Sequence, residues 1–353
     1  MMEHRHTRWY LSITMWACLG LSGLVSAAES IDLRILTWPG YADPDVVAKF
    51  EARYQVKLKV SYITNDDDMW QRMQGNQAAD YDVFAVNTAE LQRYIDQQLA
   101  VPISPENIPN LVKQLPRFKP LSTIPGIVRE QKLYAIPYTY SEMGLIYNLN
   151  YFVEPPRSWR VLWDPQYQAK ILAYNGSAHN FSLAALYNGL SNPFQLEPQQ
   201  FAEASQSLVA LRRNVLTFYK SPEQAQDLFL QEDVALLFAN YGTQQLKMLL
   251  DSGAAVGYTI PEEGALAWLD CWAIAKGVRN KSLAEKWINY SLESWVSQQL
   301  TLRQGLANTI VPAAHSLAED KIIWLQQVED QQQRSQYWQK IISGKQIAKV
   351  PPL

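Results

Sequence analysis

The chain has 353 residues, 48% hydrophobic and 18% charged, and 34 acidic against 31 basic side chains give a formal net charge of −3. This composition is typical of a globular protein and excludes disordered and collagen-like chains. The length suffices for two domains or one large one. A slightly acidic chain without a block of Lys and Arg argues against nucleic acid as the main partner. Twelve Trp and 19 Tyr are many, and we expect some of them to line a recess.

The first residues are typical of a secretory signal peptide. Two arginines precede an uncharged stretch, residues 9–25, which ends in the small residues of Val25-Ser26-Ala27. This order predicts export and cleavage after about Ala27, so that residues 1–27 are removed. The alternative is an uncleaved membrane anchor, since the stretch is about long enough to span a bilayer. No later stretch of the sequence is apolar enough to do so.

Beyond the leader, the residues that carry chemistry are few. Cys271 has no partner for an internal disulfide, and we favour a buried small residue over a nucleophile because no catalytic pattern of His and Asp surrounds it. His179 and His315 are too few for a zinc site built mainly of His and Cys. Motifs typical of P-loops, zinc proteases, serine hydrolases and dinucleotide binding are absent. We therefore expect no metal site and no cofactor, and favour a binding protein over an enzyme.

The mature chain alternates between predicted strands and helices. Helices are expected after Asp43-Pro44 and after Asn65. The second begins with three acids, residues 66–68, which could suggest a metal site, but carboxylates there cap free N–H groups and suit the helix dipole. We favour capping. This alternation of strands and helices predicts an α/β fold with mainly parallel sheets flanked by helices. Strands are predicted near residues 33–36, 56–60, 81–86, 134–138, 145–147, 171–174, 234–238 and 272–274.

Aromatic and polar residues follow the first and third of these strands. Trp38 and Tyr41 come after the first strand, and Asn87 and Thr88 come after the third. In sheets of this kind, ligands bind beyond the carboxyl ends of the strands. We therefore predict that these four residues lie at one ligand site.

Several segments occur in an order that resembles a known family. They are Ile35-Leu36-Thr37-Trp38-Pro39-Gly40-Tyr41, Asp80-Tyr81-Asp82-Val83, Ala135-Ile136-Pro137-Tyr138, Trp159-Arg160-Val161-Leu162-Trp163-Asp164-Pro165-Gln166-Tyr167 and Glu263-Gly264-Ala265-Leu266-Ala267-Trp268-Leu269-Asp270. Together they resemble the spermidine/putrescine-binding periplasmic proteins, the solute receptors of polyamine ABC transporters. The resemblance covers essentially all of the mature chain, and the last two segments are its most specific part.

The resemblance implies a two-lobed periplasmic-binding-protein fold of type II, in which hinge strands join two discontinuous α/β lobes that clamp the ligand. Lobe one would take residues 30–133 plus about 267–315, and lobe two residues 134–266 plus about 316–353. The implied function is a periplasmic receptor, monomeric, that captures a small cationic amine and delivers it to the permease of an ABC transporter. The alternatives are a sensory protein that presents its ligand to a membrane receptor, and an enzyme on the same scaffold.

Four residues match positions that hold the ligand in this family. The resemblance makes Asp270 the anchor of a terminal ammonium, with Trp38 and Trp268 as aromatic walls and Tyr41 beside them. An ammonium needs a carboxylate or a set of acceptors, and aromatic faces cover methylenes while adding cation–π attraction. The alternative is that both tryptophans belong to the core and that Asp270 caps a strand end.

The sequence departs from the family on the side of lobe two. Where the family has an acidic pair, a stacking Trp and a Tyr, this chain has Asn175 with Ser177 and His179, Asn240 with Tyr241, and Leu306. A charged His179 would repel a polycation. Glu142 either supplies one missing charge or is an ordinary surface acid. The neutral acceptors at the far end of the ligand would be Asn175, Ser177, Asn240 and Tyr241.

These departures bear on the charge of the ligand. Unpaired ions in a closed cleft are costly, and Asp270 is the one acid that the resemblance supports firmly. We therefore expect a ligand with one or two positive charges, or one shorter than spermidine. The competing view is that other acids, invisible in the sequence, turn into the cleft.

Overall fold

The computed structural model describes residues 32–312 and 321–344. The predicted leader and His315 lie outside these residues. Within them, ten α-helices accompany two large β-sheets and a small hairpin, β5 (Val128–Arg129) with β6 (Lys132–Leu133). The α/β prediction is confirmed, and each large sheet combines parallel with antiparallel pairs.

The first sheet begins with three parallel strands joined by helices. Strand β1 lies between β2 and β3, as expected for right-handed strand–helix–strand units. The sheet continues antiparallel through β13 and β7 to β14, and the short strands β4 and β15 also pair with β13. Its strands are β1 (Asp32–Thr37), β2 (Lys57–Tyr62), β3 (Val83–Asn87), β4 (Ala100–Val101), β7 (Ala135–Glu142), β13 (Ala265–Ala275), β14 (Ala307–Asn308) and β15 (Ile322–Trp324).

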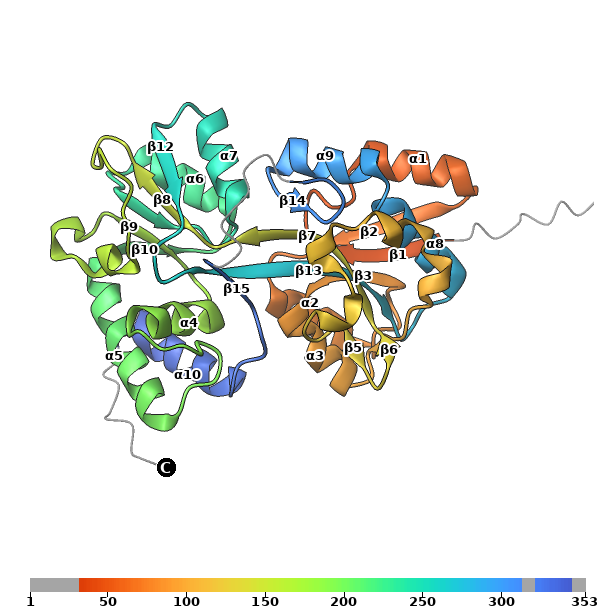
Figure 1. Ribbon diagram of the computed structural model, residues 1–353, viewed down its shortest axis with the longest axis horizontal. Helices are drawn as coiled ribbons and strands as arrows, with labels where there is room; N and C mark the ends of the chain where they lie inside the picture. The colour runs from red at the N-terminus through yellow and green to blue at the C-terminus, as the bar shows by residue number, and fades with distance from the viewer. Residues whose placement is uncertain (1–31, 313–320, 345–353) are drawn as a thin grey trace, which may run out of the picture. The chain divides into compact units, whose positions relative to one another are not determined.

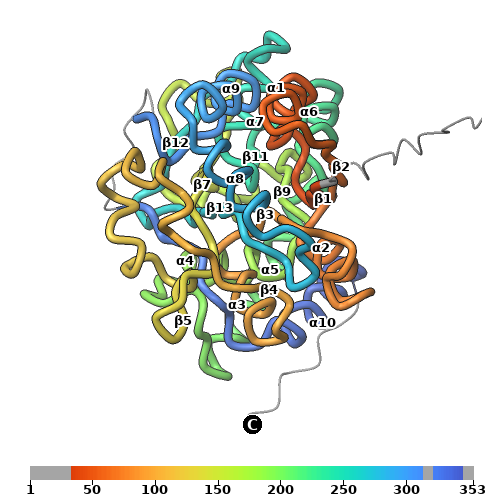
Figure 2. Tube along the Cα trace, turned by 90° about the vertical axis from the view of Figure 1, so that its right-hand side faces the viewer, coloured from red at the N-terminus to blue at the C-terminus, as the bar shows by residue number. Residues whose placement is uncertain are grey.

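The helices of this part bury apolar residues, among them Phe50 of α1, Leu91 of α3 and Ile288 of α8. Helices α8 and α9 lie beside α1, although they are far from it in the sequence (Figures 1 and 2). Tyr290 of α8 donates a hydrogen bond of 2.9 Å to the carbonyl of Val46 in α1. The helices are α1 (Pro44–Tyr54), α2 (Asp66–Gly75), α3 (Thr88–Asp96), α8 (Lys281–Ser291) and α9 (Ser294–Gln304), with four short 3-10 turns between Pro105 and Thr123.

The second sheet has the strand order β10-β9-β11-β8-β12. Strands β10, β9 and β11 are parallel, whereas β8 runs antiparallel to both of its neighbours. The elements of this part are β8 (Leu145–Asn148), β9 (Ile171–Tyr174), β10 (Val215–Tyr219), β11 (Leu236–Phe238), β12 (Val256–Thr259), α4 (Ser177–Tyr187), α5 (Pro198–Asn214), α6 (Pro222–Gln231), α7 (Thr243–Asp251) and the 3-10 turns Trp159–Trp163 and Pro165–Tyr167.

Two neighbouring strands of the first sheet connect it to the second. β7 continues into β8, and β12 leads into β13, which pairs with β7 (Figure 1). After β15, helix α10 (Gln331–Ile342) packs on α4 and α5 of the second part. The chain thus has the two-lobed fold that the resemblance implies. Because β7 pairs with β13 up to Glu142, pairing extends the first sheet into residues that we assigned to lobe two. The exact lobe boundaries stay a prediction.

The two most specific sequence segments meet at the start of β13. The indole of Trp159 donates a hydrogen bond of 2.7 Å to the carbonyl of Gly264, and Glu263 accepts from Ser158. Gly264 has a φ of +91°, which favours glycine because a side chain is strained there. This docked turn fixes the start of the strand that carries Trp268 and Asp270.

Local sequence predictions hold in several places. Pro44 is the first residue of α1, and Asn65 caps α2 by accepting a hydrogen bond of 2.8 Å from the backbone N–H of Asp68. Asp43 makes no capping bond, and its carboxylate instead accepts from Arg303 at 2.8 Å. Cys271 is buried in β13 as predicted, and burial raises the pKa of its thiol.

Candidate ligand-binding site

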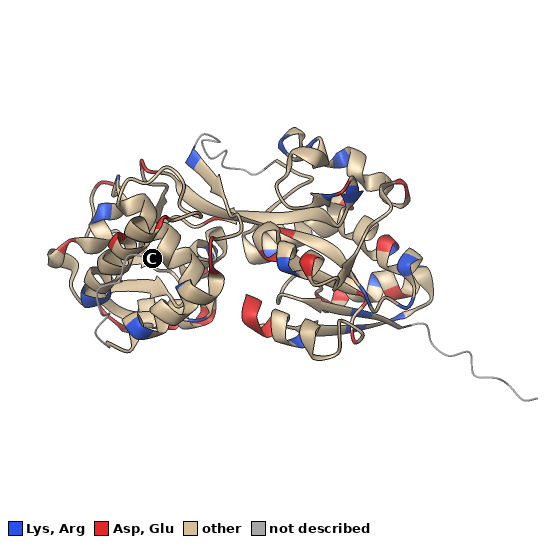
Figure 3. Cartoon of the chain, turned by 90° about the horizontal axis from the view of Figure 1, so that it is seen from below, with Lys and Arg blue, Asp and Glu red and all other residues tan. Residues whose placement is uncertain are grey.

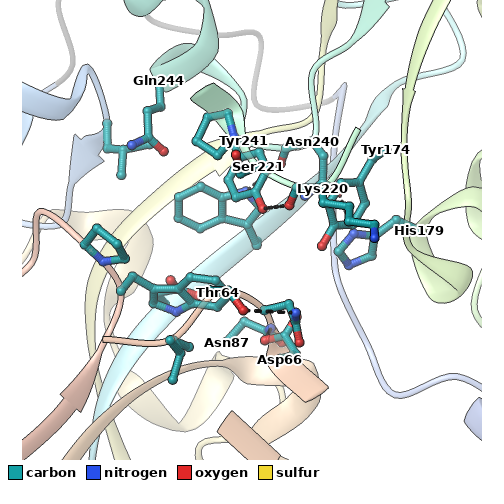
Figure 4. A pocket seen from close by; sticks show the side chains of 18 of the residues that line it. Thr64, Asp66, Asn87, Tyr174, His179, Lys220, Ser221, Asn240, Tyr241 and Gln244 are labelled. Carbon is teal, nitrogen blue, oxygen red and sulfur yellow. Dashed lines mark hydrogen bonds between the residues drawn. The ribbon is translucent and has the colours of Figure 1, made fainter. Parts of the chain in front are cut away.

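A cavity of about 380 Å³ lies among residues of both parts of the chain (Figure 4). Its lining combines aromatic rings with carboxyl, amide and imidazole groups. On the side of the first sheet the main lining residues are Trp38, Tyr41, Asp66, Asn87, Trp268 and Asp270, and on the side of the second sheet they are Tyr174, His179, Lys220, Glu223, Asn240 and Tyr241.

Strand ends bring the first group together. Trp38 and Tyr41 lie in the turn after β1, and Asn87 is the last residue of β3. Asp270 lies opposite Asn87 in the antiparallel pairing of β3 with β13. The rule that ligands bind beyond the ends of parallel strands thus leads to residues that share this cavity. Their predicted role in binding remains a proposal.

Asp270 is the most deeply placed acid of the cavity, with an exposed fraction of 6%. Tyr41 donates a hydrogen bond of 2.7 Å to its Oδ2 atom. Burial raises the pKa of Asp270 to about 7, and the hydrogen bond from Tyr41 opposes this shift. The carboxyl group therefore exchanges its proton near neutral pH, and a cation beside it would favour the charged form.

Asp66 is a second acid of the cavity, and the capping interpretation missed it. It is the first residue of α2, whose acidic first turn forms a red block in Figure 3. Asn87 donates a hydrogen bond of 3.3 Å to its Oδ1 atom. Burial and then the charges of Glu90 and Asp270 raise the pKa of Asp66, whereas Arg93 lowers it. A signal existed in the sequence, because Asp66 also follows the end of a parallel strand, β2.

The wall of the second lobe is centred on Asn240. Its backbone carbonyl accepts a hydrogen bond of 3.1 Å from the indole of Trp268, which links the two sides of the cavity. Its Oδ1 atom lies 2.6 Å from Nδ1 of His179. With a proton on Nδ1 the ring donates this hydrogen bond, and Nε2 is left as an acceptor.

His179 is neutral at neutral pH. Burial lowers its pKa to about 4, the charge of Arg334 adds to this shift, and the hydrogen bond to Asn240 opposes it. The repulsion that a charged imidazole would exert on a cationic ligand is therefore removed. That concern applied to the charged form of His179, which burial disfavours.

Aromatic rings complete the second wall. Tyr174 stacks on His179 with ring centroids 5.9 Å apart, and Tyr241 meets Tyr174 edge-on at 5.8 Å. The hydroxyl group of Tyr241 donates a hydrogen bond of 3.0 Å to the carbonyl of Lys220. These contacts hold the rings in place and leave faces that can cover an alkyl chain.

Four polar residues that we considered for the site do not line this cavity. Thr88 begins α3 and lines a separate cavity near Phe118, because the chain turns away after Asn87. Asn175 instead accepts a hydrogen bond of 2.9 Å from the indole of Trp338. Ser177, the first residue of α4, and Glu142 are also outside the lining.

Glu142 fits neither of the two roles that we considered. It is not a surface acid, because its exposed fraction is 3% in β7. Burial raises its pKa to about 7, and the nearby hydroxyl group of Tyr258 opposes the shift. The side chain is also not among the residues that line the cavity, so its position does not support the role of a replacement charge.

Further lining residues escaped the sequence reasoning. Lys220 and Ser221 follow the end of β10, so the strand-end rule could have found them. Ile63, Thr64 and Asn65 likewise follow the end of β2, and Tyr174 is the last residue of β9. The other missed residues include Pro222, Glu223, Gln244 and Leu325.

A family model described as bacterial extracellular solute-binding protein matches residues 45–330 of this chain. The chain belongs to this family. It is a family of binding proteins, in line with our preference for a binding protein over an enzyme. Among the described residues no helix is long and apolar enough to cross a membrane, and no group of three or more His, Cys, Asp or Glu side chains could hold a metal ion.

Curated relatives extend the resemblance that the sequence segments suggested, and they confirm it. The spermidine/putrescine-binding periplasmic protein 1 of Haemophilus influenzae is 24% identical over 299 residues, which cover 84% of this chain and 80% of that protein. The putrescine-binding periplasmic protein PotF of Escherichia coli is 23% identical over 375 residues, which cover 98% of this chain and 100% of that protein.

A solved structure supports the fold. The structure described as a putative spermidine/putrescine ABC transporter from Listeria monocytogenes superposes with a TM-score of 0.76 over 89% of this chain and 98% of that chain, at 20% identity. The likeness shows that the family fold is shared.

Proposed function

We propose that this protein is a periplasmic receptor that captures a small cationic amine between its two lobes and delivers it to the permease of an ABC transporter. One observation carries the proposal: the buried carboxyl group of Asp270 faces a cavity walled by aromatic rings. The names of the curated relatives, which bind putrescine or spermidine, support the same ligand class.

The chemistry of the cavity suits an alkylammonium ion. Asp270 offers a negative charge in a poorly solvated place, where attraction to a cation is stronger than in water. Trp38, Trp268 and Tyr241 offer faces that attract a cation and cover methylene groups. Neutral acceptors at His179 and Asn240 would receive hydrogen bonds from the far end of the ligand.

The distribution of charge favours a short ligand of low charge. Asp66 and Asp270 both belong to the first-lobe wall, whereas the second-lobe wall has the neutral His179 and the cation Lys220. The competing view of hidden acids is therefore partly supported, because Asp66 does turn into the cavity. Yet Asp66 lies on the same wall as Asp270, so it adds negative charge at the end of the cavity where Asp270 would already bind one ammonium group. A triamine would bring its last ammonium to the wall without a buried acid, so we expect spermidine to bind more weakly than putrescine or a monoamine.

Calorimetry on the protein from residue 28 onward tests this proposal. We expect putrescine or a monoamine to bind and spermidine to bind more weakly. As a control, the variant Asp67→Asn changes an exposed acid that does not line the cavity, and it should bind amines about as the parent does. Submicromolar binding of spermidine with no response to smaller amines would contradict the expected ligand size, and failure of every amine would contradict the function.

Location, assembly and delivery need separate measurements. N-terminal sequencing of the exported protein should find a start near Ala28, and an intact Met1 on membrane-embedded protein would contradict cleavage. Sedimentation should give a monomer. Deletion of the gene should abolish uptake of the amine by intact cells. Uptake that is unchanged while the cells lose a response to the amine would favour the sensory role.

A further inference from the structure

We infer that Asp66 and Asp270 bind one ammonium group of the ligand together, and that this binding displaces a proton from the pair. The inference rests on the proposed function. It adds a second ligand-binding carboxylate, Asp66, and a requirement that the bound nitrogen carry several hydrogen atoms.

Asn87 brings the two acids to one place. It pairs with Asp270 across strands β3 and β13, and its Nδ2 atom donates to Oδ1 of Asp66 at 3.3 Å. The other atom of its amide, Oδ1, accepts from the backbone N–H of Glu90 at 2.9 Å, which fixes the orientation of the side chain. Figure 4 shows Asp66 and Asn87 next to each other at the edge of the cavity.

Each carboxyl group has one oxygen that remains available. Tyr41 occupies Oδ2 of Asp270, and Asn87 occupies Oδ1 of Asp66. Within the part of the chain that the structure describes, no hydrogen bond reaches Oδ1 of Asp270 or Oδ2 of Asp66. An ammonium group has three N–H donors and no acceptor, so two of them suit these two oxygens.

Among the described residues no basic side chain forms an ion pair with Asp66 or Asp270, although the charge of Arg93 favours the ionised form of Asp66. The nearest arginine, Arg93, forms an ion pair with Glu90 and lies 4.4 Å from the ring centre of Trp70. Its hydrogen bond to Asp66, at 3.1 Å, goes to the backbone carbonyl. Lys220 is the one basic side chain with a full charge among the described lining residues, and it is exposed on the opposite wall. A ligand cation would therefore be the counter-charge of the pair.

The charges around the pair set its proton affinity. Burial raises the pKa of both acids, and the charge of Asp270 adds to the shift of Asp66. Across the cavity, the charge of Asp66 is one cause, after burial, of the raised pKa values of Tyr174 and Tyr241. Other titratable groups near the pair are Tyr41, Asp67, Glu90, Arg93, His179, Lys220, Glu223 and Cys271.

The proton balance follows from these surroundings. Two close carboxylates in a poorly solvated site share a proton when the site is empty, as coupled acids do. When an ammonium arrives with all of its N–H hydrogens, both carboxyl groups are favoured in the charged form. The shared proton leaves to solvent, and the ligand keeps its own protons.

Calorimetry of putrescine binding in buffers with different ionisation enthalpies counts this proton. At pH 7 we expect the parent protein to release a measurable fraction of one proton per ligand. Asp66→Asn should reduce the release to the fraction that Asp270 gives alone and weaken binding by about 10-fold or more, because one charge partner of the ammonium is lost. Asp67→Asn, in the same helix turn, removes only a minor cause of the raised pKa of Asp66. It should therefore change both quantities much less, and circular dichroism checks that each variant is folded.

The nature of the nitrogen gives a second measurement. An alkylamine should bind at least about 10-fold more tightly than its N-trimethyl counterpart, because the latter has the charge but none of the N–H donors. Equal binding of the two, or an Asp66→Asn variant with parental affinity and parental proton release, would overturn the inference while leaving the proposed function intact.

A titration without ligand separates the two proposals completely. Carboxyl carbon resonances of the aspartates, followed by NMR, should show that Asp270→Asn lowers the pKa of Asp66. If Asp66 has the pKa of an ordinary aspartate and Asp270→Asn leaves that pKa unchanged, the two acids do not form a pair. If instead the pair is seen but no amine binds, the proposed function fails and the ammonium assignment fails with it.

Discussion

The two walls of the cavity differ in how they handle charge. The wall of the first lobe holds two acids, Asp66 and Asp270, whose pKa values burial raises. The wall of the second lobe holds an imidazole, His179, whose pKa burial lowers, together with the amide of Asn240 and the ring of Tyr241. If the proposed function holds, one lobe would recognise the positive charge of the ligand, whereas the other would contribute ring faces and hydrogen-bond acceptors.

Local backbone structure explains why acids are tolerated on one side. Asp66 is the first residue of α2, and Asn87 caps α3. The free N–H groups at helix starts carry partial positive charge and favour nearby carboxylates. On the second wall, α4 begins after Gly176 without an acid in its first turn, whereas α6 has Glu223 there, and this side chain is exposed.

The largest effect should come from removing the anchor of the charged wall. Asp270→Asn should weaken binding of the preferred amine by about 2–5 kcal/mol, because a buried cation loses its counter-charge. Glu223→Gln, an exposed lining acid of the opposite wall, should cost less than about 1 kcal/mol. Calorimetry measures both, and equal losses would erase the difference between the walls.

The charged wall should also make the empty protein sensitive to pH. The pKa of Asp270 is raised from 3.8 to about 7, so the folded state binds this proton more tightly than the unfolded state. Its ionisation therefore costs no stability below pH 3.8. The cost grows as the pH rises toward 7, and it is complete above pH 7, at most about 4 kcal/mol.

Denaturant unfolding at pH 5 and pH 8 measures this cost. Asp270→Asn should lose less stability than the parent between these two values, and at pH 8 it should be the more stable protein without ligand. Comparing the two proteins removes the contributions of His179 and Glu142, which titrate in both. An identical pH dependence would mean that Asp270 is not destabilised by burial.

A negative charge placed at His179, on the wall of the second lobe, should change selectivity. His179→Glu would add a carboxylate where the ligand meets the second lobe, and it should raise the preference for putrescine over a monoamine by about 10-fold, or about 1.4 kcal/mol. His179→Gln is the neutral control. If both variants shift the ratio equally, the change comes from lost packing and not from charge.

The smallest effect should come from the contact that joins the walls. Trp268→Phe removes the hydrogen bond of 3.1 Å to the carbonyl of Asn240 and the larger indole face, and it should weaken binding by about 1 kcal/mol. Tyr41→Phe is a useful companion, since it removes the bond to Asp270 and keeps the ring. An unchanged affinity in Trp268→Phe would place the ligand away from the indole.

Much of the fold could be predicted because its signals are local. Alternation of apolar runs with amphipathic segments predicted strands and helices that the structure confirms, and strand ends pointed to Trp38, Tyr41 and Asn87. The turn that docks Trp159 on Gly264 needs a specific aromatic residue and a specific glycine, so it left a recognisable segment in the sequence.

The electrostatics of the site depend on distant partners, and for this reason the sequence alone decided less about them. The run of acids at residues 66–68 suggested helix capping, and only the folded chain brings Asp66 within hydrogen-bond distance of Asn87. Tertiary contacts also decide two other positions. Glu142 is buried outside the cavity, and Asn175 accepts a hydrogen bond from Trp338 and does not line the cavity. Residue order thus determined the elements and the family, whereas the desolvation and the neighbours that set each charge exist only after the chain has folded.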